Sequence, residues 1–501
     1  LAMGAAVTAL GTQLFGRFGE GAKLDKAGLN QVKKDADAIS AYALSEGLWY
    51  LTRQLPENHA IMVCMGEGLM PKAGETPEMG SNPQLGFGRV YARPEVARWL
   101  DQRVVRMLND PAYRWEDFYG EIKARGITVW GAAIDTLENT SRFAKGSANG
   151  ALTVLHLFNQ PLRVSRPYEG YVGNLFLPRE IVARAALESL LITFRTDRAL
   201  VVQAIENCYP EIKREHIHVW TLRGKSREHR IGELWRQWAA QGVHIIDDGF
   251  VLPSGLAAFT ESGTYAPTYR VGTWRDAHDD LHLLLVDGYA ASAEAIQAAS
   301  LAPMLNLEAS LVPFTSRFDL PYQQEQDVMS LNPDTDDFKA RLEAVIGRPA
   351  DAAAVQEFRR LIHEGIDAGI PVHKPLIHVD DFFPEKEWDV LAVCGYMQAD
   401  PYSGAPGVEQ LETNVYRSTV RLAAPRGDKL ITFTLRMMET LNQSRLVFNP
   451  LLNRFLAGED YESRPVKISD SGRIRNELQT LCTEALRSEE RRVGKECRSR
   501  W

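Results

Sequence analysis

The segment that most constrains the fold spans residues 215–249, EHIHVWTLRGKSREHRIGELWRQWAAQGVHIIDDG. A glycine-containing turn in it is followed by apolar residues at helical spacing, and the segment closes on a second apolar stretch. The pattern predicts a strand, a tight turn, an amphipathic helix packed on a sheet and a second strand. Units of this kind build α/β domains. The helical stripe consists of Ile231, Leu234, Trp235, Trp238 and Ala239.

The turn in this segment predicts an anion-binding site. Arg223, Gly224, Lys225 and Ser226 stand at the start of the predicted helix. Free backbone N–H groups, the helix dipole and cationic side chains together favour an anion there. We therefore predict that these four residues bind a ligand.

Two carboxylates are the predicted catalytic groups. Asp248 follows the strand that closes the segment, and Asp287 follows an apolar run at 281–286 that reads as another strand. A carboxylate beside a cationic anion site can act as a general base or hold Mg²⁺. Asp248 or Asp287 is expected to take one of these roles.

A second cationic helix start lies near the C-terminus. Residues 469–475, SDSGRIR, lead into an apolar helical pattern that extends to Leu486. Phosphate or carboxylate would suit the helix-terminal N–H groups and the arginines, although an ordinary capping turn has the same composition. The predicted ligand-binding residues are Ser471, Gly472, Arg473 and Arg475.

Two other sites compete with the simple anion pocket. Lys225, Ser226 and Asp287 match a phosphate-binding P-loop in type and order, but Val219 occupies the place of its first glycine, inside a predicted strand. The pair His216 and His218 would share one face of a strand and could meet a metal, which would make the chain a metal-dependent hydrolase.

The sequence DAHDDLH at 276–282 is a further cluster of possible metal ligands. A solvated loop before a strand has the same composition. The residues concerned are His278, Asp279, Asp280 and His282.

The remaining patterns predict a multidomain α/β fold with mainly parallel sheets flanked by helices, a helical insertion and a C-terminal α+β part. A helix is expected at 36–51, strands at 60–65, 199–205 and 389–394, and a hairpin across 416–437. The predicted parts are an N-terminal α/β domain (1–165), a central α/β domain (166–320), a helical insertion or connector (321–380), a C-terminal α+β domain (381–487) and a disordered tail (488–501). The tail, SEERRVGKECRSRW, also resembles translated cloning-vector sequence, so it takes no part in the fold prediction.

Composition narrows the function class. A net charge of -8 argues against a general nucleic-acid or anionic-membrane surface, and no apolar run reaches the length of about 18 residues that a membrane helix needs. Five scattered cysteines without a CxxC pair favour a reducing cytoplasm.

These features predict a cytoplasmic enzyme of small-molecule metabolism that acts on a phosphorylated or carboxylated metabolite, with neither nucleic acid nor membrane as a partner. The alternative from another class is a non-catalytic ligand-binding or regulatory protein on the same scaffold.

Overall fold

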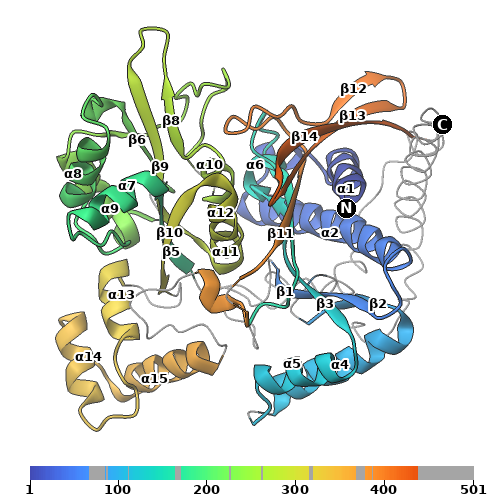
Figure 1. The fold of residues 1–501 in the computed structure, drawn as a ribbon, viewed down its shortest axis with the longest axis horizontal. Coiled ribbons are helices and arrows are strands. Elements are labelled where there is room, and N and C mark those ends of the chain that lie inside the picture. The colour runs from blue at the N-terminus through green and yellow to red at the C-terminus, as the bar shows by residue number, and fades with distance from the viewer. Residues whose placement is uncertain are drawn as a thin grey trace. The chain divides into compact units, whose positions relative to one another are not determined.

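The structure, a computed structural model, divides into two units. Unit 1 comprises Leu1–Pro161 and Asp389–Trp501, and unit 2 comprises Leu162–Trp388. Figure 1 shows the chain with its elements labelled. The structure describes residues 1–66, 85, 88–110, 112–163, 171–224, 227–260, 263–314, 320–367, 379–385 and 387–437.

Unit 1 contains an eight-stranded mixed sheet in the order β12-β13-β11-β4-β3-β1-β2, with β14 paired to β13. Its strands are β1 (His59–Gly66), β2 (Val90–Ala92), β3 (Thr128–Glu138), β4 (Leu152–Phe158), β11 (Val390–Tyr396), β12 (Glu409–Glu412), β13 (Val415–Ala424) and β14 (Gly427–Arg436). Its helices are α1 (Ala2–Phe15), η1 (Glu20–Lys23), α2 (Lys26–Thr52), α4 (Pro94–Asn109), α5 (Trp115–Ala124) and α6 (Thr140–Ala144).

Helices α1 and α2 form the core of unit 1 together with the sheet. Leu10 of α1 and Ile39 of α2 are buried in one cluster with Val393 of β11 and Val420 of β13. The backbone of α1 approaches β11 closely, because a Cβ at Gly395 would lie 2.4 Å from the carbonyl oxygen of Ala5. Only glycine permits this approach without a shift.

Unit 2 contains a six-stranded mixed sheet in the order β10-β5-β9-β6-β7, with β8 paired to β9. Its strands are β5 (Tyr171–Pro178), β6 (Ile217–Trp220), β7 (His244–Ile245), β8 (Gly272–Arg275), β9 (Leu281–Ala291) and β10 (Leu307–Phe314). Its helices are α7 (Arg179–Leu187), α8 (Arg198–Cys208), η2 (Arg214–His216), α9 (Glu228–Ala240), α10 (Tyr265–Thr268), α11 (Ser292–Ser300), α12 (Ala302–Leu305), α13 (Tyr322–Met329), α14 (Phe338–Ile346), α15 (Ala352–Asp367) and η4 (Val379–Phe382).

The unit 2 sheet lies between two groups of helices. Figure 1 shows α7, α8 and α9 on one side of it and α10, α11 and α12 on the other. Successive side chains of a strand point to opposite faces, so each residue of β9 faces one of these groups. This alternation decides the environment of every candidate site residue on β9.

The predicted strand–helix–strand segment is confirmed. Strand β6, helix α9 and strand β7 follow in order, and β6 and β7 pair in parallel. Ile231, Leu234 and Trp238 of the predicted stripe are buried, whereas Trp235 is half-buried and Ala239 is exposed. The helix therefore packs on the sheet along the expected face, with a narrower buried stripe.

The prediction of mainly parallel sheets is not what the described strands show. The parallel pairs are β1–β3, β6–β7 and β6–β9, and the other pairs among the described strands are antiparallel. Short apolar runs look alike in buried strands of either direction, so the sequence pattern did not distinguish them.

The segment predicted as a strand at 199–205 is a helix instead. It lies within α8, where the carboxylate of Asp197 accepts a hydrogen bond from the N–H of Ala199. A short apolar run cannot separate a buried strand from a buried helix, and the N-cap signal outweighs it here.

The C-terminal strands join the N-terminal sheet, which differs from the predicted separate domain at 381–487. Strand β11 pairs with β4 along its whole length, and β13 and β14 extend the same sheet. The predicted hairpin across 416–437 is confirmed by β13 and β14, whose last described pair is Ala424 with Gly427.

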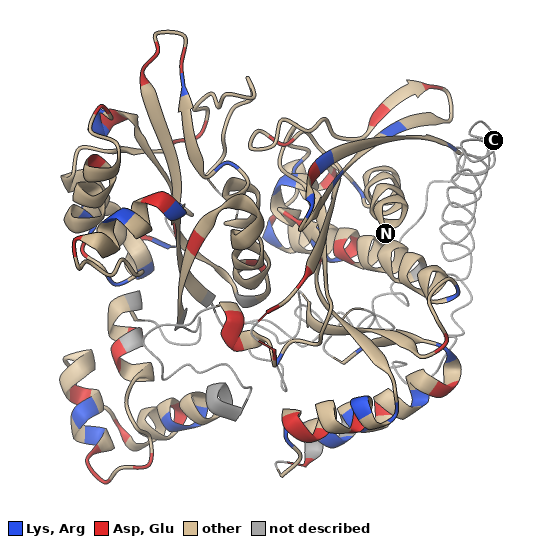
Figure 2. Cartoon of the chain, in the orientation of Figure 1, with Lys and Arg blue, Asp and Glu red and all other residues tan. Residues whose placement is uncertain are grey.

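The segment 321–380 is helical where it is described, through α13, α14 and α15. Figure 2 shows basic and acidic positions interspersed along α14, α15 and α4, as expected for solvated helix faces. Among the described residues, no helix combines the length and the apolar character needed to cross a membrane.

Candidate functional site

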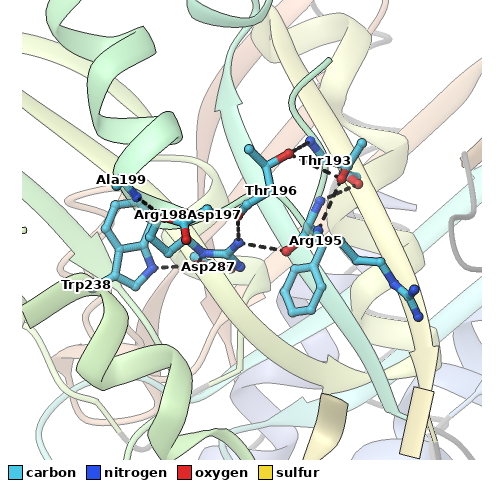
Figure 3. Close-up of polar contacts among 10 residues, drawn as sticks. Thr193, Arg195, Thr196, Asp197, Arg198, Ala199, Trp238 and Asp287 are labelled. Carbon is cyan, nitrogen blue, oxygen red and sulfur yellow. Dashed lines mark hydrogen bonds and ion pairs between the residues drawn. The ribbon is translucent and has the colours of Figure 1, made fainter. Parts of the chain in front are cut away.

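Asp287, one of the two predicted catalytic carboxylates, is enclosed in the protein interior. Strand β9 continues past it to Ala291, so the expected strand end is wrong. The Asp287 carboxylate accepts hydrogen bonds from Nε of Arg198 at 2.7 Å, Nη2 of Arg198 at 3.1 Å and Nε1 of Trp238 at 2.5 Å (Figure 3). Nη1 of Arg198 donates to the carbonyl oxygens of Phe194 and Thr196.

This arrangement makes Asp287 a structural residue. Its side chain is fully buried, and that of Arg198 is 2% exposed. Burial raises the pKa of the Asp287 carboxyl, and the guanidinium and the indole N–H act in the opposite direction. A buried, bidentate ion pair with its oxygens already bonded has no place for a substrate or for Mg²⁺.

The predicted anion-binding turn follows β6, but its described arginine already has a partner. The Arg223 guanidinium forms an ion pair with Asp247 and lies 5.8 Å from the centre of the Trp235 ring. Gly224 has a φ of 137°, and its carbonyl oxygen accepts the N–H of Arg227 at 2.9 Å. Helix α9 begins after Arg227, which makes no side-chain cap.

Asp248, the other predicted catalytic carboxylate, follows β7 as expected. It is exposed, and its Oδ1 accepts the backbone N–H of Thr260 at 2.5 Å. That bond fixes the loop after β7 to a second loop. The other predicted ligand-binding residues lie outside the described residues: Lys225, Ser226, Ser471, Gly472, Arg473 and Arg475.

The structure instead gathers three histidines on the face of the unit 2 sheet opposite Asp287. His218 of β6 pairs with His244 of β7, and it lies opposite Leu284 of β9. His282 is two residues before Leu284, so its side chain is on the same face. Trp274 of β8 lies opposite His282. We name His244, His218 and His282 the imidazole row.

The imidazole row is a continuous hydrogen-bonded chain. Nδ1 of His218 lies 2.7 Å from Nδ1 of His244, and Nε2 of His218 lies 2.8 Å from Nδ1 of His282. At one end, Nε2 of His282 lies 3.5 Å from Oδ2 of Asp276. That last distance is longer than a hydrogen bond, so Asp276 acts on His282 mainly through its charge.

The chain has a direction because each neutral imidazole carries one N–H and one lone pair. The Asp276 carboxylate favours the His282 tautomer with its proton on Nε2. Nδ1 of His282 then accepts from Nε2 of His218, and Nδ1 of His218 accepts from Nδ1 of His244. The network thus leaves Nε2 of His244 with a free lone pair at the outer end.

Burial keeps the row neutral. It lowers the pKa of His218 to about 3, with smaller contributions from the neighbouring His244, His282 and His216. It also lowers the pKa of His244, against the charge of Asp247, and that of His282, against the charge of Asp276. His218 is 4% exposed, whereas His244 is half-buried, so solvent reaches the outer end of the chain.

Asp276 is held as a carboxylate. Burial opposes its ionisation, but hydrogen bonds from the backbone N–H groups of His278 and Asp280 outweigh that effect and lower its pKa. A permanent negative charge at one end of the row is the condition for this tautomer order.

Aromatic rings line the row. The Trp274 ring stacks at 5.4 Å from His218 and 5.2 Å from His282, measured between ring centres. The Phe250 ring lies 4.9 Å from His218 and 4.8 Å from His244. These rings exclude water from the inner imidazoles, which is the cause of their lowered pKa.

The predicted metal pair His216 and His218 does not converge on one point. His216 precedes β6 in η2 and stacks on His282 with ring centres 4.1 Å apart. Both nitrogens of His218 are already occupied by imidazoles. Across the part of the chain that the structure describes, no group of three or more His, Cys, Asp or Glu residues is arranged to hold a metal ion.

The cluster at 276–282 divides between two environments. His282 and Asp276 belong to the row, whereas Asp280 forms an ion pair with Lys213 at 2.8 Å. His278 and Asp279 are exposed in the turn between β8 and β9. The interpretation as a solvated loop is therefore correct for His278 and Asp279 and wrong for His282.

Unit 1 has a pocket between α1 and α2, but its lining side chains offer no acid, base or nucleophile stronger than a tyrosine hydroxyl. Its side chains are apolar apart from Tyr50 and Gln54. The remaining lining residues are Leu1, Met3, Gly4, Val7, Leu44, Gly47, Leu48, Leu51 and Leu155.

No protein-family model and no curated protein matches this chain. Sequence reasoning found His218 and His282 only as parts of possible metal clusters, and it missed His244, Trp274 and Asp276. A signal was present, since each of the three row histidines stands at the first or second position of a strand.

Proposed function

We propose that this chain is an enzyme of small-molecule metabolism that acts on a phosphorylated or carboxylated metabolite and uses the imidazole row to move a proton. The observation that supports the proposal is the chain His244, His218, His282, which starts at a half-buried imidazole and ends at a carboxylate. Catalytic bases need a lone pair in the substrate's reach and a group that stabilises the resulting cation.

In this proposal Nε2 of His244 takes a proton from the substrate. The Nδ1 proton of His244 moves to Nδ1 of His218, and the Nε2 proton of His218 moves to Nδ1 of His282. His282 then either remains an imidazolium beside the Asp276 carboxylate or passes its Nε2 proton to that carboxylate. The positive charge taken up with the proton is thereby carried away from the substrate, while the imidazole rings keep their positions and only protons move.

The anionic part of the metabolite remains assigned to the turn after β6 that the sequence predicts as an anion site. Lys225 and Ser226 keep their proposed role in ligand binding, and Asp248 remains a candidate for a Mg²⁺ ligand because it is an exposed carboxylate in the loop after β7. Asp287 has no part in the proposal.

A screen of phosphorylated and carboxylated metabolites tests it. Thermal shift with and without Mg²⁺ identifies ligands of the wild type, and product formation from each ligand is then followed by mass spectrometry. His244→Gln is expected to bind the ligand but to lose at least about a hundredfold in rate, the usual contribution of a general base.

The matched control is Lys225→Ala, which is expected to weaken binding and leave the rate at saturation close to that of wild type. The proposal is wrong if no ligand shifts the wild type, or if His244→Gln turns over the ligand at the wild-type rate. Binding without turnover in the wild type would identify the chain as the non-catalytic ligand-binding protein.

A further inference from the structure

Arg270 differs from the other arginines of unit 2 that lie over aromatic rings. Four such arginines are described, and each guanidinium lies within 6 Å of a ring centre: Arg198, Arg223, Arg270 and Arg359. Arg198 is paired with Asp287, and Arg223 with Asp247. Arg359 donates to the carbonyl oxygen of Thr335.

The Arg270 guanidinium has no carboxylate or carbonyl partner among the described residues. Its contact there is with the ring of Trp274, at 4.9 Å from the ring centre. Arg270 is half-buried, and burial lowers its pKa. A guanidinium has five N–H donors, and taking them out of water without acceptors is unfavourable unless an anion supplies the acceptors.

Trp274 connects this cation to the imidazole row. The same indole that contacts Arg270 stacks on His218 and His282. The short connection between α10 and β8 carries Arg270, and β8 pairs directly with the strand of His282. A cation whose N–H donors have no carboxylate or carbonyl acceptor among the described residues therefore shares Trp274 with the imidazole row.

We propose that Arg270 is the residue that binds the substrate's oxyanion, a phosphate or carboxylate group, beside the imidazole row. That the bound oxyanion belongs to a substrate rests on the proposed function. A planar guanidinium held flat on an indole presents its N–H edge to such a group, and two parallel hydrogen bonds to two oxygens then orient it. Arg270 would thus act beside the residues proposed at Lys225 and Ser226, and Arg223 would not, because Asp247 already neutralises its charge.

Inorganic phosphate and citrate are the probes for a titration of the full chain by calorimetry. Arg270→Gln is expected to lower the affinity for at least one of them by tenfold or more, on the order of one lost charge-assisted contact. Arg270→Lys should retain part of the affinity, because it keeps the positive charge but loses the two parallel N–H donors of the guanidinium. Arg223→Gln is the matched control and should bind like the wild type, since its guanidinium is satisfied within the protein.

A measurement on the wild type covers the case in which Arg270→Gln does not fold. Phenylglyoxal modifies accessible arginines, and peptide mass spectrometry reports each position separately. Phosphate or citrate should protect Arg270 from modification and leave the modification of Arg223 unchanged. The inference is overturned if Arg270→Gln binds both probes like the wild type, if neither probe binds, or if Arg270 is not protected.

The failure of this inference can be told apart from the failure of the proposed function. Unchanged probe binding in Arg270→Gln, together with lost turnover in His244→Gln, removes the role of Arg270 and keeps the proton-transfer chain. Lost probe binding in Arg270→Gln, together with normal turnover in His244→Gln, does the reverse.

Discussion

Strand β9 carries an ionisable side chain on each of its faces, and the two are treated in opposite ways. On one face, Asp287 is enclosed by Arg198 and Trp238 with its charge fully matched. On the other face, His282 is hydrogen-bonded to His218, which is hydrogen-bonded to His244. His218 and His244 are neutral because burial lowers their pKa. A matched charge pair is fixed in one state, whereas a neutral imidazole chain can accept a proton at one end and pass it on.

The comparison shows why burial alone does not identify a functional group. Asp287 is the more deeply buried of the two and has a shifted pKa, yet its bonding is complete within the protein. The imidazole row has an unfilled acceptor at Nε2 of His244, on the half-buried end of the chain. The proposed reactivity is therefore assigned to the face whose hydrogen bonding is incomplete.

The largest expected effect is on the Asp287 face. Asp287→Ala leaves the Arg198 guanidinium buried without its partner and should lower the free energy of unfolding by about 3 to 5 kcal/mol. Chemical denaturation followed by circular dichroism measures the loss. Asp247→Ala, which breaks the exposed pair with Arg223, is the control and should cost no more than about 1 kcal/mol.

The opposite ranking of these two variants would contradict the structural role of Asp287. The double variant Arg198→Leu with Asp287→Leu adds a further test, because removing both charges should restore part of the stability that Asp287→Ala loses.

An effect that is absent at neutral pH and grows only as the pH falls is expected from His218, in the pH dependence of stability. The folded protein holds the pKa of His218 at about 3, below its ordinary value of 6.5, so its contribution to stability is complete above pH 6.5. As the pH falls from 6.5 toward 3, the unfolded chain binds the proton first, and the free energy of unfolding falls by up to about 1.4 kcal/mol per pH unit. His218→Asn should remove this slope.

His156 provides the comparison in unit 1. Burial lowers its pKa to about 3 as well, so His156→Asn should remove a separate slope of the same sign. Denaturation curves between pH 4 and 7 for the two variants measure both contributions. A wild-type slope in His218→Asn would show that His218 is protonated as easily in the folded protein as in the unfolded chain.

The smallest effect on stability is expected for Asp276→Asn, which tests the tautomer order of the row through the chemical reactivity of His244 and His218. Diethyl pyrocarbonate acylates imidazole nitrogens that have a free lone pair, so His244 should react at neutral pH while His218 stays protected by its two hydrogen bonds. Peptide mass spectrometry reads both positions. Asp276→Asn should slow the reaction of His244, since the charge that orders the chain is gone, and should change stability little.

Equal acylation of His218 and His244 would contradict the order of the row. Asp279→Asn is the control for Asp276→Asn, because Asp279 is exposed in the turn before β9 and its carboxylate lies 3.8 Å from Nε of Arg275.

The sequence predicted the local part of this arrangement. The strand, helix and strand of residues 215–249 were recognised because their apolar spacing is set by contacts within one short segment. Asp248 was placed correctly after a strand for the same reason. Asp287 was misplaced, since Asp-Gly reads as a turn although β9 continues through it to Ala291.

The imidazole row could not be predicted because it depends on pairing between distant strands. His218, His244 and His282 meet only when β6 pairs with both β7 and β9 in one register. A shift of one residue in that register would move a histidine to the opposite face. The apolar pattern of a strand does not predict which other strands it pairs with.

Strand β4 has a consequence for how the protein is made. It pairs with β11, and Asn159 at the end of β4 bonds the backbone of Asp389, 230 residues later in the chain. A ribosome adds roughly 5 to 20 residues per second, so β11 is synthesised on the order of 10 to 50 seconds after β4. During that time the edge of β4 that pairs with β11 remains open. All of unit 2 is synthesised in that interval. During synthesis the nascent chain therefore displays β4 with one edge paired to β3 and the other edge open, and a chaperone bound at the open edge would protect it from aggregation.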